Sequence, residues 1–182
     1  DKMNFAYLDE HMDEYLTAFT TDKKPRVVSH ILIAMDDPKK PTADEAARLQ
    51  AVKDALAGGM SFKDAVVKYS EDSQTNQKEG LLGYMDKDTS YQADFLAAAL
   101  ALNEDQTSAW ITTSYGYHLI QRQTADLTAL KTYDEFYYAI LNANAKLPMK
   151  ILWANAQALH VNFNGNTELE TAIKKYLGLD GE

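Results

Sequence analysis

The 182-residue sequence contains no cysteine. This absence excludes thiol catalysis, a disulfide framework and a zinc site with cysteine ligands, and it is compatible with an oxidising compartment. Long apolar runs are also missing, because no stretch approaches the roughly 18–20 residues that a transmembrane helix needs. We therefore expect no direct membrane insertion by this chain. It begins at Asp1 without a start methionine, so we expect it to be a piece of a longer product.

Basic residues are scarce, with 18 Lys and Arg against 27 Asp and Glu and a net charge of −9. No run of Lys and Arg offers a track for phosphates or an anchor for anionic lipids. This balance argues against nucleic acid as a partner. Hydrophobic residues make up 46% of the chain, which is enough for a substantial core in one large domain or in a domain with an appended lobe.

Two short apolar segments each carry one histidine. His30 lies in the predicted strand at 26–33, and His118 lies in the apolar segment at 113–120. A sheet built from such segments buries at least one face, and a buried imidazole needs a hydrogen-bond partner. Because the chain has only four histidines, these two suggest a paired site.

Local signals predict a succession of elements that includes these strands. In chain order they are a strand at 26–33, a helix from the capping box of Thr42 and Glu45 to Gly58-Gly59, a short helix from Ser61, a polar loop at 70–80, a short central strand at 82–85, a helix at 93–101, and strands at 107–112 and 116–122 around a tight turn at Tyr115-Gly116. The order is β-α-α-β-α-β-β.

The flanks of this unit have helical patterns. They comprise an amphipathic helix at 3–20, a helix from a capping box of Thr132 and Glu135 that Pro148 breaks or kinks, a strand-like alternation at 161–163, and a last helix capped by Thr167 and Glu170. Neither flank is long enough to be stable alone. We therefore predict that residues 1–25 and 124–182 pack together as one helical lobe around a domain at 26–123.

Three further motifs lie between the two histidine strands. They are Tyr69-Ser-Glu-Asp72-Ser73, Gly80-Leu-Leu82-Gly83-Tyr-Met85 and, downstream, Phe95. In this order the sequence resembles the parvulin (rotamase) family of peptidyl-prolyl cis-trans isomerases over residues 26–123. The resemblance implies an α+β fold with an antiparallel-rich four-stranded sheet and surrounding helices. The helices before and after this domain make the layout similar to that of PrsA-like bacterial foldases.

Prolyl isomerisation twists a partial double bond against a barrier of about 18–20 kcal/mol. An enzyme must therefore bind the twisted amide better than either planar form, which calls for an apolar slot with polar groups beside it. The resemblance implies His30, Asp72, His118 and Thr113 as catalytic residues and Leu82, Met85, Tyr91 and Phe95 as substrate-binding residues. It implies no cofactor and no metal.

Some positions depart from the family pattern. Met85 stands where an aromatic residue is usual, Leu81 replaces a polar residue, and the segment 86–91 replaces a Gly-Gln-Met sequence. These departures favour an alternative, a weakly active or inactive holdase that only binds unfolded polypeptide. A metal-dependent enzyme that uses His30 and His118 is a third interpretation, and the lack of a carboxylate at ligand spacing opposes it.

Two other sets of residues could in principle bind a metal or a phosphate. His11 lies in the acidic segment 9–14, which could hold a metal but which favours a solvated helix face. Lys39 and Lys40 could bind a phosphate, but the acidic residues at 36–37 beside them argue against phosphate selectivity.

The resemblance also implies the setting of the protein. It predicts unfolded or proline-containing polypeptides as clients and a role in the folding of exported proteins. It predicts an extracytoplasmic, membrane-anchored lipoprotein whose signal and anchor lie outside this fragment. A homodimer through the helical lobe is a further expectation.

Overall fold

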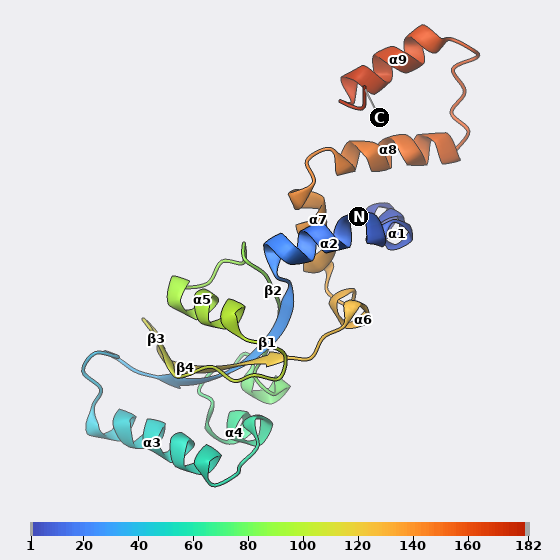
Figure 1. Cartoon of the computed structure of the whole chain (residues 1–182). Helices are drawn as coiled ribbons and strands as arrows, with labels where there is room; N and C mark the ends of the chain where they lie inside the picture. Colours follow the sequence, from blue (N-terminus) through green and yellow to red (C-terminus); the bar gives the residue numbers. More distant parts are fainter. Residues whose placement is uncertain (1, 181–182) are drawn as a thin grey trace. The chain divides into compact units, whose positions relative to one another are not determined.

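The computed structural model describes residues 2–180 and divides into two compact units, one at 20–133 and one formed by the segments up to 19 and from 134 onward. The first unit contains β1 (Arg26–Ala34), α3 (Ala43–Ala57), α4 (Phe62–Tyr69), a 3₁₀ turn (Asn76–Lys78), β2 (Leu81–Met85), α5 (Ala93–Ala101), β3 (Ile111–Thr113), β4 (Gly116–Gln123) and α6 (Leu127–Leu130). The other helices are α1 (Lys2–Glu10), α2 (Met12–Lys23), α7 (Asp134–Ala143), α8 (Leu147–Ala158) and α9 (Thr167–Tyr176) (Figure 1).

The four strands form one antiparallel sheet in the order β2-β1-β4-β3. This arrangement confirms the predicted α+β fold. The prediction of a central strand at 82–85 is wrong, because β2 lies at an edge. The central places belong to β1 and β4, whose apolar runs are buried over most of their length, as expected of strands that are covered on both faces.

The sheet carries a helical layer on each face (Figure 1). Ile31 and Ile33 of β1, together with Leu119 of β4, pack against Val52 of α3 and Val66 of α4. Side chains alternate between the two faces along a strand. The even-numbered residues of β1 and β4 therefore share the opposite face.

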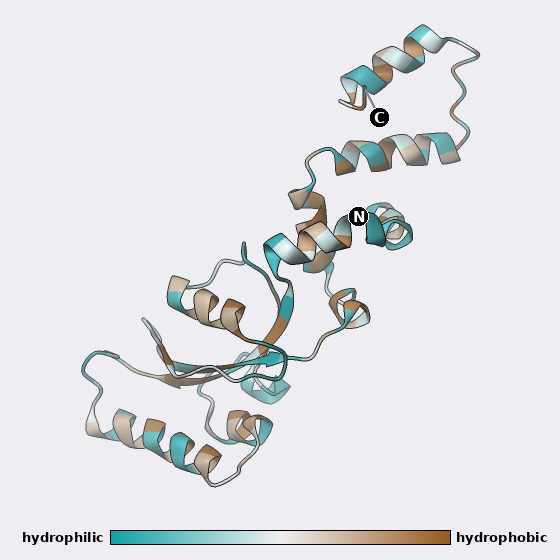
Figure 2. Cartoon of the chain, viewed as in Figure 1, coloured by the Kyte–Doolittle hydropathy of each residue, from teal (hydrophilic) through white to brown (hydrophobic). Residues whose placement is uncertain are grey.

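On that opposite face, Val28 and Ile120 form a second core with Met85 of β2 and with Phe95 and Ala99 of α5. Figure 2 shows apolar residues along both central strands and most of α5, whereas α3 alternates between polar and apolar positions. The pattern of α3 is that of a helix with one face in water.

Predicted helix boundaries are confirmed where a local cap defines them. The Thr42 side chain accepts a hydrogen bond from the Glu45 N–H, and the Glu45 carboxylate accepts one from the Thr42 N–H at 2.6 Å. Gly58 ends the same helix, and Ser61 caps α4.

The single helix predicted at 3–20 is wrong, because α1 and α2 are separated at His11. The His11 ring Nδ1 lies 2.8 Å from the Tyr7 carbonyl oxygen, to which the His11 backbone N–H also donates. A side chain that competes for a helical carbonyl in this way disturbs the regular ladder.

Two predicted strands also differ from the structure. Only residues 111–112 of the predicted strand at 107–112 lie in a strand, apart from one isolated bridge at Thr107. The Ser108 hydroxyl accepts the Ile120 N–H at 3.0 Å and so replaces a backbone carbonyl in the ladder. Residues 161–163 form no strand, and Phe163 instead stacks on the Trp153 ring.

Two predicted caps are wrong as well. α7 begins at Asp134, one residue later than a cap at Thr132 requires, and the Thr132 hydroxyl instead donates to the Ala129 carbonyl in α6. The cap of α9 is Asn166, whose side chain accepts the Leu169 N–H, one residue before the predicted Thr167. Pro148 occupies the first turn of α8, where its missing N–H is harmless.

The terminal segments form a helical unit with an aromatic core. Phe5 of α1 stacks on Tyr137 of α7 with ring centroids 4.4 Å apart, and Phe19 of α2 meets Phe136 edge-on at 5.8 Å. The Tyr137 hydroxyl donates to Asp9 at 2.9 Å. Within residues 2–180, no helix has both the length and the apolar character that crossing a membrane requires.

The close approach of Gly80 to the backbone of β1 can be tested by substitution. Gly80 has φ +75°, and an added Cβ would lie 2.3 Å from the His30 carbonyl oxygen. We expect Gly80→Ala to lower the free energy of unfolding by roughly 2–4 kcal/mol. Gly59→Ala is the matched control, because Gly59 has φ +93° but open space around it. Equal losses for both variants in urea unfolding would contradict a steric role for Gly80.

Candidate active site

Four polar side chains from separate elements form one hydrogen-bonded series. The Asp72 carboxylate, in the loop after α4, lies 2.8 Å from Nε2 of His30 on β1. Nδ1 of His30 lies 3.2 Å from Nδ1 of His118 on β4, and Nε2 of His118 lies 2.7 Å from the Thr113 hydroxyl at the end of β3. The structure thus brings together the four residues predicted to be catalytic.

The register of the sheet creates this contact. His30 pairs with Ile120 and Leu32 pairs with His118, so the two histidines are diagonal neighbours on one face. Their rings are nearly parallel, with centroids 5.4 Å apart. Both imidazoles are buried, and their hydrogen bonds satisfy the requirement that burial imposes.

Only one arrangement of protons satisfies this series with neutral imidazoles. The Asp72 carboxylate is an acceptor, so His30 carries its proton on Nε2 and accepts at Nδ1. His118 then donates from Nδ1, and its Nε2 accepts from the Thr113 hydroxyl. The Thr113 oxygen in turn accepts the Tyr115 N–H at 3.2 Å, so each hydrogen bond has one donor and one acceptor.

Burial keeps both imidazoles neutral. It lowers the pKa of His30 against the opposing effect of the Asp72 carboxylate. Burial, together with the neighbouring His30, lowers the pKa of His118 to about 4. Burial raises the pKa of the Asp72 carboxyl. Hydrogen bonds from Thr75 and His30 outweigh this effect and hold that pKa below its usual value. At neutral pH the site therefore has one anion beside two neutral rings.

The series opens onto a cavity of about 450 Å³. Its apolar and aromatic lining comprises Leu32, Leu82, Tyr91, Phe95 and Tyr115. The Phe95 ring meets both imidazoles edge-on, with centroids 5.9 Å from His30 and 5.2 Å from His118. Tyr91 stacks on Phe95 at 5.2 Å. An apolar slot thus lies directly against the polar series.

The expected place of Met85 needs correction. Its side chain is fully buried in the core with Val28 and Ile120, and it is not part of the cavity lining. The reason is that its strand pairs with the start of β1, so its side chain packs inside the core that also contains Phe95. A change at Met85 can therefore alter the cavity only through packing.

Sequence reasoning missed other residues of the site. The Thr75 hydroxyl donates to Asp72 at 2.6 Å, and its spacing of three residues from an aspartate is typical of a polar turn. At the cavity rim, the Gln92 amide donates to the Ser114 hydroxyl at 2.7 Å and accepts the Ser114 N–H at 3.0 Å. No local pattern indicates that pair, because 22 residues separate its members.

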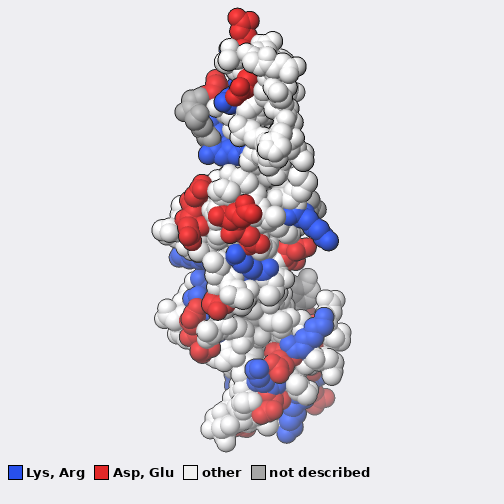
Figure 3. Space-filling view, turned by 90° about the vertical axis from the view of Figure 1, so that its right-hand side faces the viewer, with Lys and Arg blue, Asp and Glu red and all other residues white. Residues whose placement is uncertain are grey.

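The remaining polar candidates lie outside this cavity. The His11 ring stacks on Tyr7 with centroids 4.0 Å apart. Within residues 2–180, no three His, Asp or Glu side chains gather as a metal-binding group. Lys39 and Lys40 are exposed in the loop before α3. On the face drawn in Figure 3, basic side chains are interspersed with acidic ones, so this face presents charges of both signs.

The low pKa of His118 has a consequence for stability. An unfolded imidazole protonates near pH 6.5, whereas folded His118 resists protonation down to about pH 4. Between these values the unfolded state binds more protons, so the free energy of unfolding falls as pH drops through the window, by roughly 2–3 kcal/mol. Above about pH 6.5, His118 adds no pH dependence to the free energy of unfolding.

Urea unfolding between pH 7.5 and about pH 4, compared between the wild type and His118→Asn, measures this contribution. The difference in stability between the two proteins should shrink as pH falls. A difference that stays constant across the window would show that His118 is not buried in neutral form.

Comparisons with known proteins agree with this geometry. A family model for rotamase, the PPIC-type PPIASE domain, matches residues 30–124. Foldase protein PrsA of Clostridium kluyveri is 32% identical over 123 residues, which are 65% of this chain and 33% of that protein. Foldase protein PrsA 1 of Bacillus cereus is 34% identical over 113 residues, which are 62% of this chain and 35% of that protein.

The crystal structure of PrsA from Bacillus subtilis has a TM-score of 0.50 and 25% identity, and the match covers 96% of this chain and 55% of that one. The chain spans about a third of the length of the two PrsA proteins that it matches in sequence. The family model, in contrast, covers more than half of this chain and includes both site histidines, Asp72 and Phe95. The chain therefore belongs to the PPIC-type, or parvulin, family of peptidyl-prolyl isomerases.

Proposed function

We propose that this chain is a peptidyl-prolyl cis-trans isomerase that stabilises the twisted prolyl amide without a covalent intermediate. The observation that supports this most is the apolar slot at Phe95, which directly contacts two neutral imidazoles in series with one carboxylate. Asp72 already accepts hydrogen bonds from His30 and Thr75. It is therefore suited to an electrostatic role rather than to nucleophilic attack.

Amide resonance explains how such a site could act. The planar amide is the charge-separated form, and rotation about C–N removes this polarity. An apolar, water-excluding slot around the proline ring favours the less polar twisted form. A carboxylate beside the carbonyl oxygen adds to this preference, because it opposes the negative charge that the planar form places there. Asp72 would supply that charge, while His30 and His118 maintain the shape of the site.

We further propose that the chain assists the folding of exported proteins as part of an extracytoplasmic, membrane-anchored lipoprotein. The names of its foldase relatives support this role. Large apolar side chains on the terminal helical unit also support it, because Leu159 is 75% exposed and Tyr176 is 90% exposed. Such a surface suits unfolded, proline-containing polypeptide. Association of two copies through this unit stays a prediction. Analytical ultracentrifugation, which measures the oligomeric state, would test it.

Phe95 provides the direct test of the isomerase proposal. In a protease-free assay on short Xaa-Pro peptides, Phe95→Ala should lower kcat/KM by roughly tenfold or more, because the slot loses apolar area that the twisted ring needs. Leu96→Ala is the matched control, since Leu96 packs on the same core but does not line the cavity. A wild-type rate equal to that of buffer would favour the holdase alternative instead.

The two compact units allow the holdase and isomerase activities to be separated. Residues 20–133 contain the complete cavity, so this fragment should keep the isomerase activity of the full chain. It should lose most of the ability to suppress aggregation of an unfolded client, because it lacks the exposed apolar helices. Light scattering with a denatured client measures this. A fragment that protects the client as well as the full chain does would contradict the division.

A further inference from the structure

The edge of β1 continues beyond the strand that covers it. β2 pairs with β1 only as far as Ser29, whereas β1 runs on to Ala34. The outward N–H groups of His30, Leu32 and Ala34 therefore lack a strand partner. An unpaired edge of this kind invites association with another chain, and buried donors without partners are costly.

The loop at 70–80 satisfies these three donors in turn. The His30 N–H donates to the Gly80 carbonyl at 2.9 Å, and the Leu32 N–H donates to the Ser70 hydroxyl at 3.2 Å. The Ala34 N–H donates to the Glu71 carboxylate at 2.7 Å. The loop thus replaces a missing strand, and most of its acceptors there are side chains.

Glu71 is attached to β1 at two points. Its backbone N–H donates to the Leu32 carbonyl at 2.8 Å, while its carboxylate binds the Ala34 N–H. Arg48 of α3 completes the arrangement, because its Nε lies 2.9 Å from Glu71 and another guanidinium nitrogen donates to the Ala34 carbonyl at 3.0 Å. Arg48 and Glu71 together therefore satisfy both backbone groups of Ala34.

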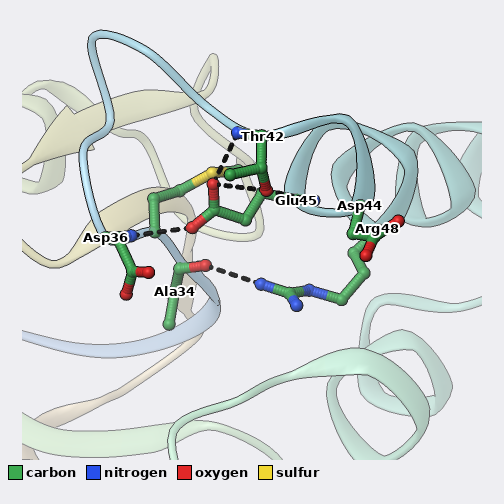
Figure 4. A pocket seen from close by; sticks show the side chains of 7 residues that line it. Ala34, Asp36, Thr42, Asp44, Glu45 and Arg48 are labelled. Carbon is green, nitrogen blue, oxygen red and sulfur yellow. Dashed lines mark hydrogen bonds between the residues drawn. The ribbon is translucent and has the colours of Figure 1, made fainter.

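Figure 4 shows the Arg48 end of this arrangement, in a hollow of about 320 Å³ beside the end of β1. The Arg48 guanidinium points at the Ala34 carbonyl oxygen. The nearby Glu45 carboxylate, in the first turn of α3, accepts hydrogen bonds from the N–H groups of Asp36 and Thr42. Glu71 is thus the carboxylate that pairs with Arg48.

We propose that Glu71, held by Arg48, is a positioning residue that sets the distance between Asp72 and His30. The expected effect of Glu71 on the reaction rate rests on the proposed isomerase function. Glu71 directly precedes Asp72 in the chain, and its two bonds to β1 fix the backbone at that point relative to the strand that carries His30.

The bonds of Asp72 itself do a different task. Besides its bond to His30 on β1, its carboxylate accepts the Gln74 N–H at 3.1 Å and the Thr75 hydroxyl at 2.6 Å, and the latter two bonds orient the side chain within the loop. The bonds to Gln74 and Thr75 stay within the loop, whereas the Glu71 bonds hold the backbone against β1. The Glu71 side chain is 31% exposed and that of Arg48 is 47% exposed, so their ion pair contributes little stability. The effect of Glu71 is therefore one of geometry.

A double-mutant cycle on the full chain tests this. Glu71→Ala should lower kcat/KM by about tenfold, because small displacements of a catalytic group reduce rates strongly. In the Asp72→Ala background the same change should have no further effect, since a residue that acts through Asp72 has nothing left to position. Glu71→Gln, which keeps an acceptor for the Ala34 N–H, should retain more activity than Glu71→Ala.

Lys63→Met is the matched control. It breaks the exposed Lys63–Glu79 ion pair at the other end of the same loop, and it should leave kcat/KM unchanged. Activities are compared at a temperature at which every variant is folded. Additive effects in the cycle, or a Glu71→Ala protein with wild-type kcat/KM, would overturn the proposal.

A second measurement does not depend on activity. The His30 Nε2–H, bonded to a carboxylate, should give a slowly exchanging imidazole proton signal in NMR spectra. Both Asp72→Ala and Glu71→Ala should weaken or shift that signal, whereas Lys63→Met should not. If the wild type proves inactive, the isomerase proposal fails and this signal alone decides the positioning role. An unchanged His30 signal in Glu71→Ala would refute it.

Discussion

The antiparallel pairing of β1 with β4 forms the centre of the sheet and brings the two site histidines into contact. Its register sets His30 opposite Ile120 and His118 opposite Leu32, so both imidazoles stand on the face that carries α5. A slip of one residue in either strand would turn its histidine to the other face, into the core of α3 and α4. There the imidazole would lose the hydrogen-bond partner that a buried ring requires.

Burial determines the chemistry of the pair. A polar series inside a core is stable only when each of its members has a partner, and the sequence of bonds from Asp72 to Thr113 meets this condition with neutral rings. Because the rings stay neutral, the single carboxylate is the only full charge of the series. Phe95 contacts both rings, so the apolar wall of the cavity lies directly beside the polar series.

The loop between α4 and β2 has two structural roles. It completes the exposed edge of β1 and, in the same few residues, supplies the acid of the site. Two adjacent acids consequently have different surroundings. Glu71 faces a backbone N–H and a guanidinium, whereas Asp72 faces an imidazole and a hydroxyl. Local pattern alone shows two neighbouring carboxylates in a polar loop, and only the resemblance to the parvulin family singles out Asp72.

Features that local chemistry encodes could be predicted from the sequence. The Thr42 capping box, the apolar histidine strands and the ordered motifs of the parvulin family predicted the fold and the members of the polar series. Tertiary structure decided what depends on distant partners. Ser108 and His11 interrupt regular elements through side-chain hydrogen bonds that no periodicity reveals.

The same reason explains the rest of the site. Met85 belongs to the motif but packs beneath the cavity, and Gln92 reaches the rim through a hydrogen bond to Ser114 far along the chain. Periodicity and spacing report only on neighbours along the chain. Which side chain lines a cavity, and which carboxylate faces an imidazole, is decided by strand register and loop closure, because these bring together residues that the sequence keeps apart.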